Sequence, residues 1–64
     1  MRINVSYERL VFPKLSEMQL ADILKFAGKM EVFEGLNGYA VRGNKADMYE
    51  MIVNLSYKYD IEIV

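Results

Sequence analysis

The chain of 64 residues contains no cysteine and no histidine. Without cysteine, no disulfide can tie the fold together and no thiolate can act as a nucleophile or a metal ligand. Without histidine, the chain lacks the most common general base and the most common metal-binding side chain of proteins. These two absences predict a protein that is not an enzyme and that has no cofactor and no metal site.

An excess of basic residues is also missing. Eight lysines and arginines stand against nine acidic residues, the net charge is −1, and the charges are spread evenly along the chain. Nucleic-acid-binding domains usually show a basic cluster, so nucleic acid is not the expected partner. No apolar run is long enough to span a membrane, and the first residues do not resemble a signal peptide. We therefore expect a cytoplasmic protein that does not bind membranes.

The length predicts a single domain over residues 1–64. A chain this short buries only about 60% of the surface that it exposes when unfolded, so its core is small. Small scaffolds without disulfides often gain stability by self-association, and we therefore expect a homodimer.

The strongest local signal is a β-hairpin over residues 31–43. Asn37 and Gly38 are the favoured pair for a two-residue turn whose central residues both have positive φ. A longer loop that ends at Gly38 is the alternative, and it pairs Val32 with Val41. Both registers put the same side chains on each face, because side chains alternate along a strand. The face expected to meet the helices carries Val32, Glu34, Leu36, Tyr39 and Val41. The opposite face carries Glu31, Phe33, Gly35, Ala40 and Arg42.

A strand and a helix are predicted before the hairpin. Residues 2–7 alternate between apolar and polar, which is typical of a half-buried strand. Its inward side chains are Ile3, Val5 and Tyr7. Ser16 and Gln19 have the spacing of a capping box, and Gly28 is placed to end the helix that they begin. The charged residues on its predicted solvated face are Asp22, Lys25 and Lys29.

A second helix and a short strand are predicted after the hairpin. Asn44 is placed as the N-cap of this helix, which should end near Asp60. Its core-facing stripe comprises Met48, Met51, Ile52, Leu55 and Tyr59. Residues 61–64 then form the last strand. The resulting order βαββαβ predicts an α+β fold of the ferredoxin-like type, in which two split βαβ units form a sandwich. This fold has a four-stranded antiparallel sheet of strand order 4-1-3-2 with two helices on one face.

Residues 8–14 fit neither a helical nor a strand period. Leu10, Val11 and Phe12 are consecutive large apolar residues, and Pro13 disfavours a helix. We expect a loop here that either continues the preceding strand or packs beneath it. Its apolar residues either cap the core or form an exposed patch for a partner.

Because no motif forces a chemistry, the functional hypothesis is protein–protein interaction. The chain is expected to be a small regulator or inhibitor, of the kind that phages and mobile elements encode, that acts as a homodimer and binds a protein partner. An edge strand, formed by residues 31–34 or 61–64, could add to a partner's sheet. The candidate partner-binding residues are Leu10, Val11, Phe12, Glu31, Phe33 and Arg42.

Two alternatives remain. RNA-recognition domains share this strand order, and their third strand carries the pattern K/R-G-F/Y-G/A-F-V-x-F/Y. Residues 37–41, Asn-Gly-Tyr-Ala-Val, resemble the first half of that pattern, but Val41 replaces an aromatic residue. The resemblance implies binding of single-stranded nucleic acid on the open sheet face. Its candidate residues here are Arg2, Asn4, Phe33 and Arg42. The other alternative, by analogy of fold alone, is a small-molecule sensor domain.

Overall fold

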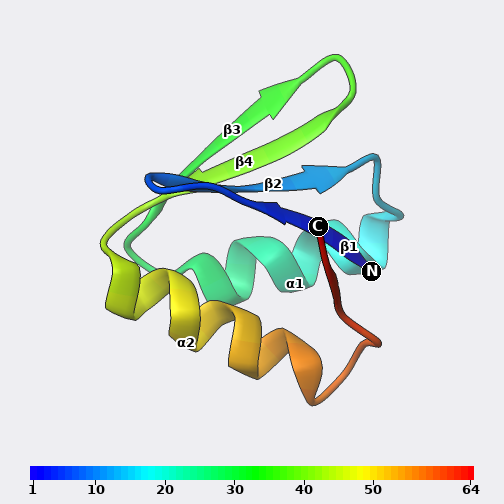
Figure 1. Cartoon of the computed structure of the whole chain (residues 1–64). Coiled ribbons are helices and arrows are strands. Elements are labelled where there is room, and N and C mark those ends of the chain that lie inside the picture. Colours follow the sequence, from blue (N-terminus) through cyan, green and yellow to red (C-terminus); the bar gives the residue numbers. More distant parts are fainter.

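The computed structural model describes residues 1–64 and has an α+β architecture, in which two helices cover one face of a five-stranded sheet (Figure 1). The elements are β1 (Arg2–Val5), β2 (Arg9–Pro13), α1 (Glu17–Ala27), β3 (Glu31–Gly35), β4 (Gly38–Arg42), α2 (Lys45–Ser56) and β5 (Glu62–Ile63). The strand order across the sheet is β3-β4-β2-β1-β5. Strands β1 and β5 are parallel and the other neighbours are antiparallel, so the sheet is mixed.

The prediction of a four-stranded antiparallel sheet is wrong because it misses a central strand. The segment predicted as a loop forms β2, which lies between β1 and β4. Leu10 and Phe12 point into the core, whereas Val11 between them points to the other face. An apolar residue on the outer face therefore conceals the alternation of this strand. Pro13 is tolerated because it is the last residue of β2, where a missing N–H costs little pairing.

Strand β1 is shorter than predicted because the chain turns back after Val5. Both the backbone N–H and the hydroxyl of Ser6 donate hydrogen bonds to the carbonyl of Arg9, at 3.0 and 3.1 Å. This turn makes β1 and β2 an antiparallel hairpin. Strand β1 therefore lies between β2 and β5 in the sheet. Tyr7, which was predicted to face inward, lies in the turn and is 76% exposed.

Both helices begin at the predicted N-caps. The N–H of Gln19 donates to Oγ of Ser16 at 3.2 Å, and the N–H of Ser16 donates to Oε1 of Gln19 at 3.1 Å, which completes the capping box. At the start of α2, Oδ1 of Asn44 accepts a hydrogen bond from the N–H of Asp47 at 2.8 Å. Helix α1 ends at Ala27 and is capped by Gly28, whose φ of 56° favours glycine.

Helix α2 ends at Ser56, earlier than the predicted end near Asp60. Tyr59, which was predicted to lie on the helical stripe, instead packs against the core from the turn after the helix. The last strand is also shorter than predicted, and β5 pairs with the N-terminal strand β1.

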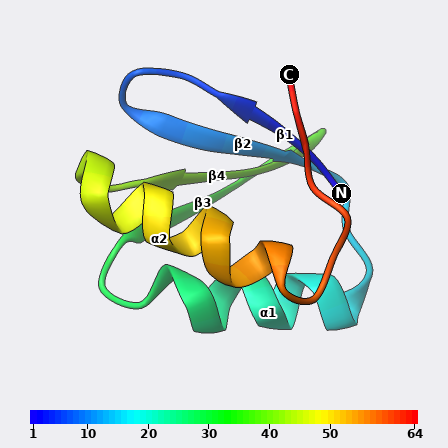
Figure 2. The same cartoon turned by 60° about the horizontal axis from the view of Figure 1, so that its bottom comes forward.

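The core lies between the helices and the sheet (Figure 2). Its most buried side chains come from three strands and both helices. Those at most 1% exposed are Ile3, Leu10, Phe12, Ile23, Val41, Met51 and Leu55. Neither helix is long and apolar enough to cross a membrane.

The hairpin of β3 and β4 has the alternative register, in which Val32 pairs with Val41, but Gly35 and Gly38 also pair, so the loop between the strands has two residues. The turn residues are Leu36 and Asn37, and neither has positive φ, so the predicted turn at Asn37-Gly38 is wrong. Gly38 belongs to β4 and has a φ of 151°. A Cβ at this position would overlap the backbone of Phe12 and Pro13 on β2. The close approach of β2 therefore explains why glycine stands there.

Candidate functional site

The sheet face that the helices leave uncovered brings together most of the predicted site residues. Cross-strand pairing arranges its side chains in two adjacent rows. The first row comprises Glu31, Arg42 and Arg9. The second row comprises Phe33, Ala40, Val11 and Asn4. We call these seven residues, together with Arg2 on β1, the open face.

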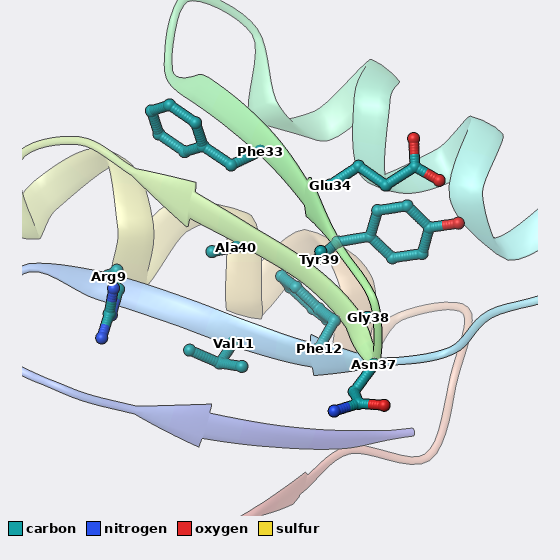
Figure 3. A pocket seen from close by; sticks show the side chains of 10 residues that line it. Arg9, Val11, Phe12, Phe33, Glu34, Asn37, Gly38, Tyr39 and Ala40 are labelled. Carbon is teal, nitrogen blue, oxygen red and sulfur yellow. The ribbon is translucent and has the colours of Figure 1, made fainter.

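The centre of the second row is apolar. Phe33 is 44% exposed and Val11 is 38% exposed, and Ala40 lies between them on β4. These side chains line a shallow hollow of about 350 Å³ that also includes Arg9 (Figure 3). The apolar floor of this hollow can contact side chains of another protein.

All three arginines of the chain stand on the open face, on β1, β2 and β4. No strand contains a lysine. Arg2 is neutralised, because its Nε lies 3.1 Å from Oε1 of Glu62. Arg9 and Arg42 lie directly opposite each other on neighbouring strands, and neither forms an ion pair. Two like charges therefore stand side by side, and Glu31, opposite Arg42 on β3, is the only acidic residue in their row.

A second, more polar hollow adjoins the arginine pair. It has a volume of about 430 Å³, and Arg9 and Arg42 line it together with Tyr7 and Glu8 from the β1–β2 turn. The ammonium of Lys45, at the start of α2, lies 4.5 Å from the centre of the Tyr7 ring. This end of the open face thus carries three cationic side chains, Arg9, Arg42 and Lys45, together with the carboxylates of Glu8 and Glu31.

The predicted partner-binding residues separate into two groups. Leu10 and Phe12 are wrong as surface residues, because each is 1% exposed and belongs to the core. Val11 is the only member of that apolar run on the open face. The other predicted residues, Glu31, Phe33, Arg42, Arg2 and Asn4, all lie on the open face. Arg9 was missed, since only the recognition of β2 as a strand would have aligned it with Arg42.

Strand β3 forms one edge of the sheet, and the two-residue β5 forms the other. Only β3 is long enough to accept an added strand. Glu31 points to the open face and Glu34, opposite Tyr39, points to the helical side. Charged residues on an edge strand hinder its pairing with another chain, so the carboxylates on the two faces of β3 both disfavour such pairing.

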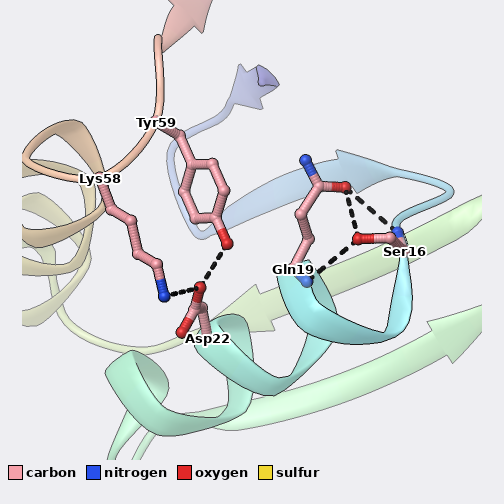
Figure 4. Close-up of polar contacts among 5 residues, drawn as sticks. All are labelled: Ser16, Gln19, Asp22, Lys58 and Tyr59. Carbon is pink, nitrogen blue, oxygen red and sulfur yellow. Dashed lines mark hydrogen bonds and ion pairs between the residues drawn. The ribbon is translucent and has the colours of Figure 1, made fainter.

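A cluster of Asp22, Lys58 and Tyr59 lies on the helical side of the sheet (Figure 4). The Tyr59 hydroxyl donates a hydrogen bond to Oδ2 of Asp22, and Nζ of Lys58 lies 2.9 Å from the same oxygen. Asp22 is only 8% exposed, which corrects its predicted place on the solvated face. The cluster joins α1 to the turn after α2.

The contacts within this cluster shift the pKa values of all three side chains. The hydrogen bond from Tyr59, followed by the one from Lys58, lowers the pKa of Asp22. The bond to Asp22 raises the pKa of Lys58 and also raises the pKa of Tyr59. All three groups are therefore engaged with each other at neutral pH, and none is left as a free base. No group of three or more side chains that could hold a metal ion gathers in the structure.

On the open face, Arg9 and Arg42 form no ion pair within the chain. In the Asp22 cluster, by contrast, the three polar side chains bond to one another. No protein-family model, no curated protein and no solved structure matches this chain.

Proposed function

We propose that the chain is a small non-enzymatic protein that binds a protein partner through the open face. The supporting observation is the distribution of its cationic residues, because every arginine lies on the open face and no strand contains a lysine. Protein interfaces are enriched in arginine and depleted in lysine. The guanidinium group is less strongly hydrated than an ammonium group and forms planar, directional hydrogen bonds.

The apolar row supports the same proposal. Phe33, Ala40 and Val11 form a continuous strip across three strands, with arginines beside it. An apolar centre with a polar rim is the usual anatomy of a protein interface, and aromatic residues and arginine are frequent among its energetically important residues.

We also propose that the fold is a variant of the ferredoxin-like arrangement. The elements from β2 to β5 follow the order βαββαβ. If β1 is set aside, the remaining strands have the order β5-β2-β4-β3, which corresponds to 4-1-3-2. In this interpretation β1 is an inserted strand, which explains why β5 has a parallel neighbour.

Affinity capture tests the proposed function. Purified wild-type chain is compared with Val11→Ser/Phe33→Ser and with Tyr49→Ser/Tyr57→Ser in nuclease-treated extract of the source cells. The second variant is a matched control, because Tyr49 and Tyr57 are also exposed but belong to α2 and its C-terminus. We expect the wild type and the control to retain the same protein and the open-face variant to lose it. Equal retention by all three folded chains, or retention of no protein, contradicts the proposal.

Binding of single-stranded nucleic acid is a second candidate, since Arg2, Asn4, Phe33 and Arg42 share one face as that alternative requires. Phe33 is the only aromatic residue in the two rows, whereas stacking platforms usually have several. Binding to a single-stranded oligonucleotide that weakens steeply with salt would favour this candidate.

The proposed homodimer has one available edge. Pairing of β3 with β3 of a second copy would extend the sheet, but Glu31 and Glu34 oppose it by placing a charge on each face of the seam. Sedimentation equilibrium of the wild type and of Glu31→Gln/Glu34→Gln measures this opposition. A dimer formed through β3 is expected to be tighter in the variant.

A further inference from the structure

We propose that the partner presents an acidic protein segment to the open face, and that Arg9 and Arg42 together bind its carboxylates. Apolar side chains next to those carboxylates would contact Val11 and Phe33. The inference depends on the proposed function, because it names the chemistry of the partner for the same surface.

The arginine pair itself is the first reason. Directly opposite residues of an antiparallel pair have Cβ atoms about 4.5–5.5 Å apart, and like charges placed there are unfavourable. Arg9 and Arg42 occupy such positions and have no ion-pair partner in the chain. A carboxylate can accept two parallel hydrogen bonds from one guanidinium, so an acidic segment would neutralise both groups.

The arrangement of the two hollows is the second reason. Arg9 lines the apolar hollow with Val11 and Phe33 (Figure 3). It also lines the polar hollow with Arg42. The two hollows are therefore adjacent. A segment that places an apolar side chain in one hollow reaches the other with its next few residues, which fits alternating or neighbouring apolar and acidic residues.

Acidic protein fits this face better than a phosphate backbone. Glu31 stands opposite Arg42 on the β3 side, and Glu8 lines the polar hollow. A regular row of phosphates would meet these two carboxylates as well as the arginines. A protein segment can restrict its charges to the arginine pair, and its apolar residues match the second row.

Selection from a random peptide library, displayed on phage, tests the proposal without a known partner. The bait is the full wild-type chain, and we expect the selected peptides to be enriched in Asp and Glu next to apolar residues. A representative synthetic peptide should bind Arg9→Gln/Arg42→Gln at least about tenfold more weakly than wild type. Lys25→Gln/Lys29→Gln removes the same charge from the helical layer and should bind like wild type within about twofold.

A third variant has an effect of the opposite sign. Glu31→Gln removes the acid that stands beside Arg42 and competes for it, so the same peptide should bind this variant more tightly than wild type. Replacing the acidic residues of the peptide by Asn and Gln should abolish both the tighter binding to Glu31→Gln and the weaker binding to Arg9→Gln/Arg42→Gln.

The outcomes separate this inference from the proposed function. Peptides without an acidic excess that bind equally to Arg9→Gln/Arg42→Gln, but not to Val11→Ser/Phe33→Ser, overturn the acidic partner and leave the open face as a binding surface. Peptides that bind all these variants alike overturn both. Selection of no peptide, or tighter arginine-dependent binding of a single-stranded oligonucleotide than of any selected peptide, also overturns the proposal.

Discussion

The covered and open faces of the sheet alternate along the same strands, yet they differ in the kind of side chain that they carry. On β2, Leu10 and Phe12 are each 1% exposed, whereas Arg9 and Val11 point to the opposite face. The covered face is apolar at its centre and packs against both helices. The open face combines adjacent like charges with exposed apolar groups, neither of which stabilises a monomer. The covered face thus accounts for the stability of the fold, whereas the open face contributes little to it.

The sharpest test of this difference compares two neighbouring residues. Phe12→Ala should reduce the free energy of unfolding by about 3–5 kcal/mol, because it leaves a cavity in the core. Val11→Ala should change it by no more than about 0.5 kcal/mol, as is usual for surface substitutions. Urea unfolding followed by circular dichroism measures both values. If the alanine variant does not fold, Phe12→Leu replaces it, with an expected loss in the free energy of unfolding of about 1–1.5 kcal/mol. Equal losses at positions 11 and 12 would contradict the assignment of faces.

Two glycines at the base of the hairpin turn provide the next comparison. Gly38→Ala should destabilise by about 2 kcal/mol or more, because its Cβ would overlap the backbone of β2 and its φ of 151° is unfavourable for alanine. Gly35 pairs with Gly38, but a Cβ there would meet only the carbonyl oxygen of Gly38 at 3.7 Å. Gly35→Ala should therefore leave the urea midpoint almost unchanged. A similar loss at both positions would mean that hairpin geometry, and not the approach of β2, requires glycine.

Acid unfolding tests the one charged group that the covered side buries. Asp22 has a lowered pKa in the folded chain, so its ionised form contributes stability above the ordinary carboxyl pKa of about 4. That contribution is lost as the pH falls through the lowered folded value. Asp22→Asn should therefore be less stable than wild type at neutral pH, and the difference should shrink as the pH falls below the ordinary carboxyl pKa. Urea midpoints across this range measure it, with the exposed Asp60→Asn as the control. A difference that is constant with pH would exclude the ionised cluster as its cause.

Local signals predicted much of this fold. The capping box of Ser16 and Gln19, the cap at Asn44 and the glycine end of α1 depend on interactions within a few residues, and the structure confirms them. Strand β2 could not be predicted in the same way. Its outward Val11 hides the period of two, and its pairing with β1 and β4 depends on residues that are distant in sequence. Because β2 was not predicted as a strand, the sheet was predicted with four strands instead of five, and β1 was predicted to be antiparallel to the last strand instead of parallel.

The open face shows the same limit. The residues on the two hairpin strands were assigned to the correct face, because alternation holds whichever register forms. Leu36, which was predicted to meet the helices, lies in the turn and is 92% exposed. Arg9 was not assigned to either face, since a residue in a presumed loop has no face. Likewise, Asp22 has the sequence spacing of a solvated position, and only the turn after α2 brings Lys58 and Tyr59 to it.

The smallest predicted effect bears most directly on the open face. Arg9→Thr removes one of two like charges that stand directly opposite each other and introduces a residue that favours strands. It should raise the free energy of unfolding by about 0.2–1 kcal/mol. Arg2→Thr is the matched control on the same face, because Arg2 is paired with Glu62, and it should have no effect or a slightly destabilising one.

The sign of these two changes matters more than their size. Urea unfolding at low salt should show the gain for Arg9→Thr, and salt near 1 M should reduce it, because screening weakens the repulsion between Arg9 and Arg42. If Arg9→Thr destabilises the chain as much as Arg2→Thr or more, Arg9 supports the fold, and repulsion between Arg9 and Arg42 does not reduce the stability of the chain. If it stabilises the chain while peptide binding falls, Arg9 reduces stability in the free chain and is retained for the contact that it makes with a partner.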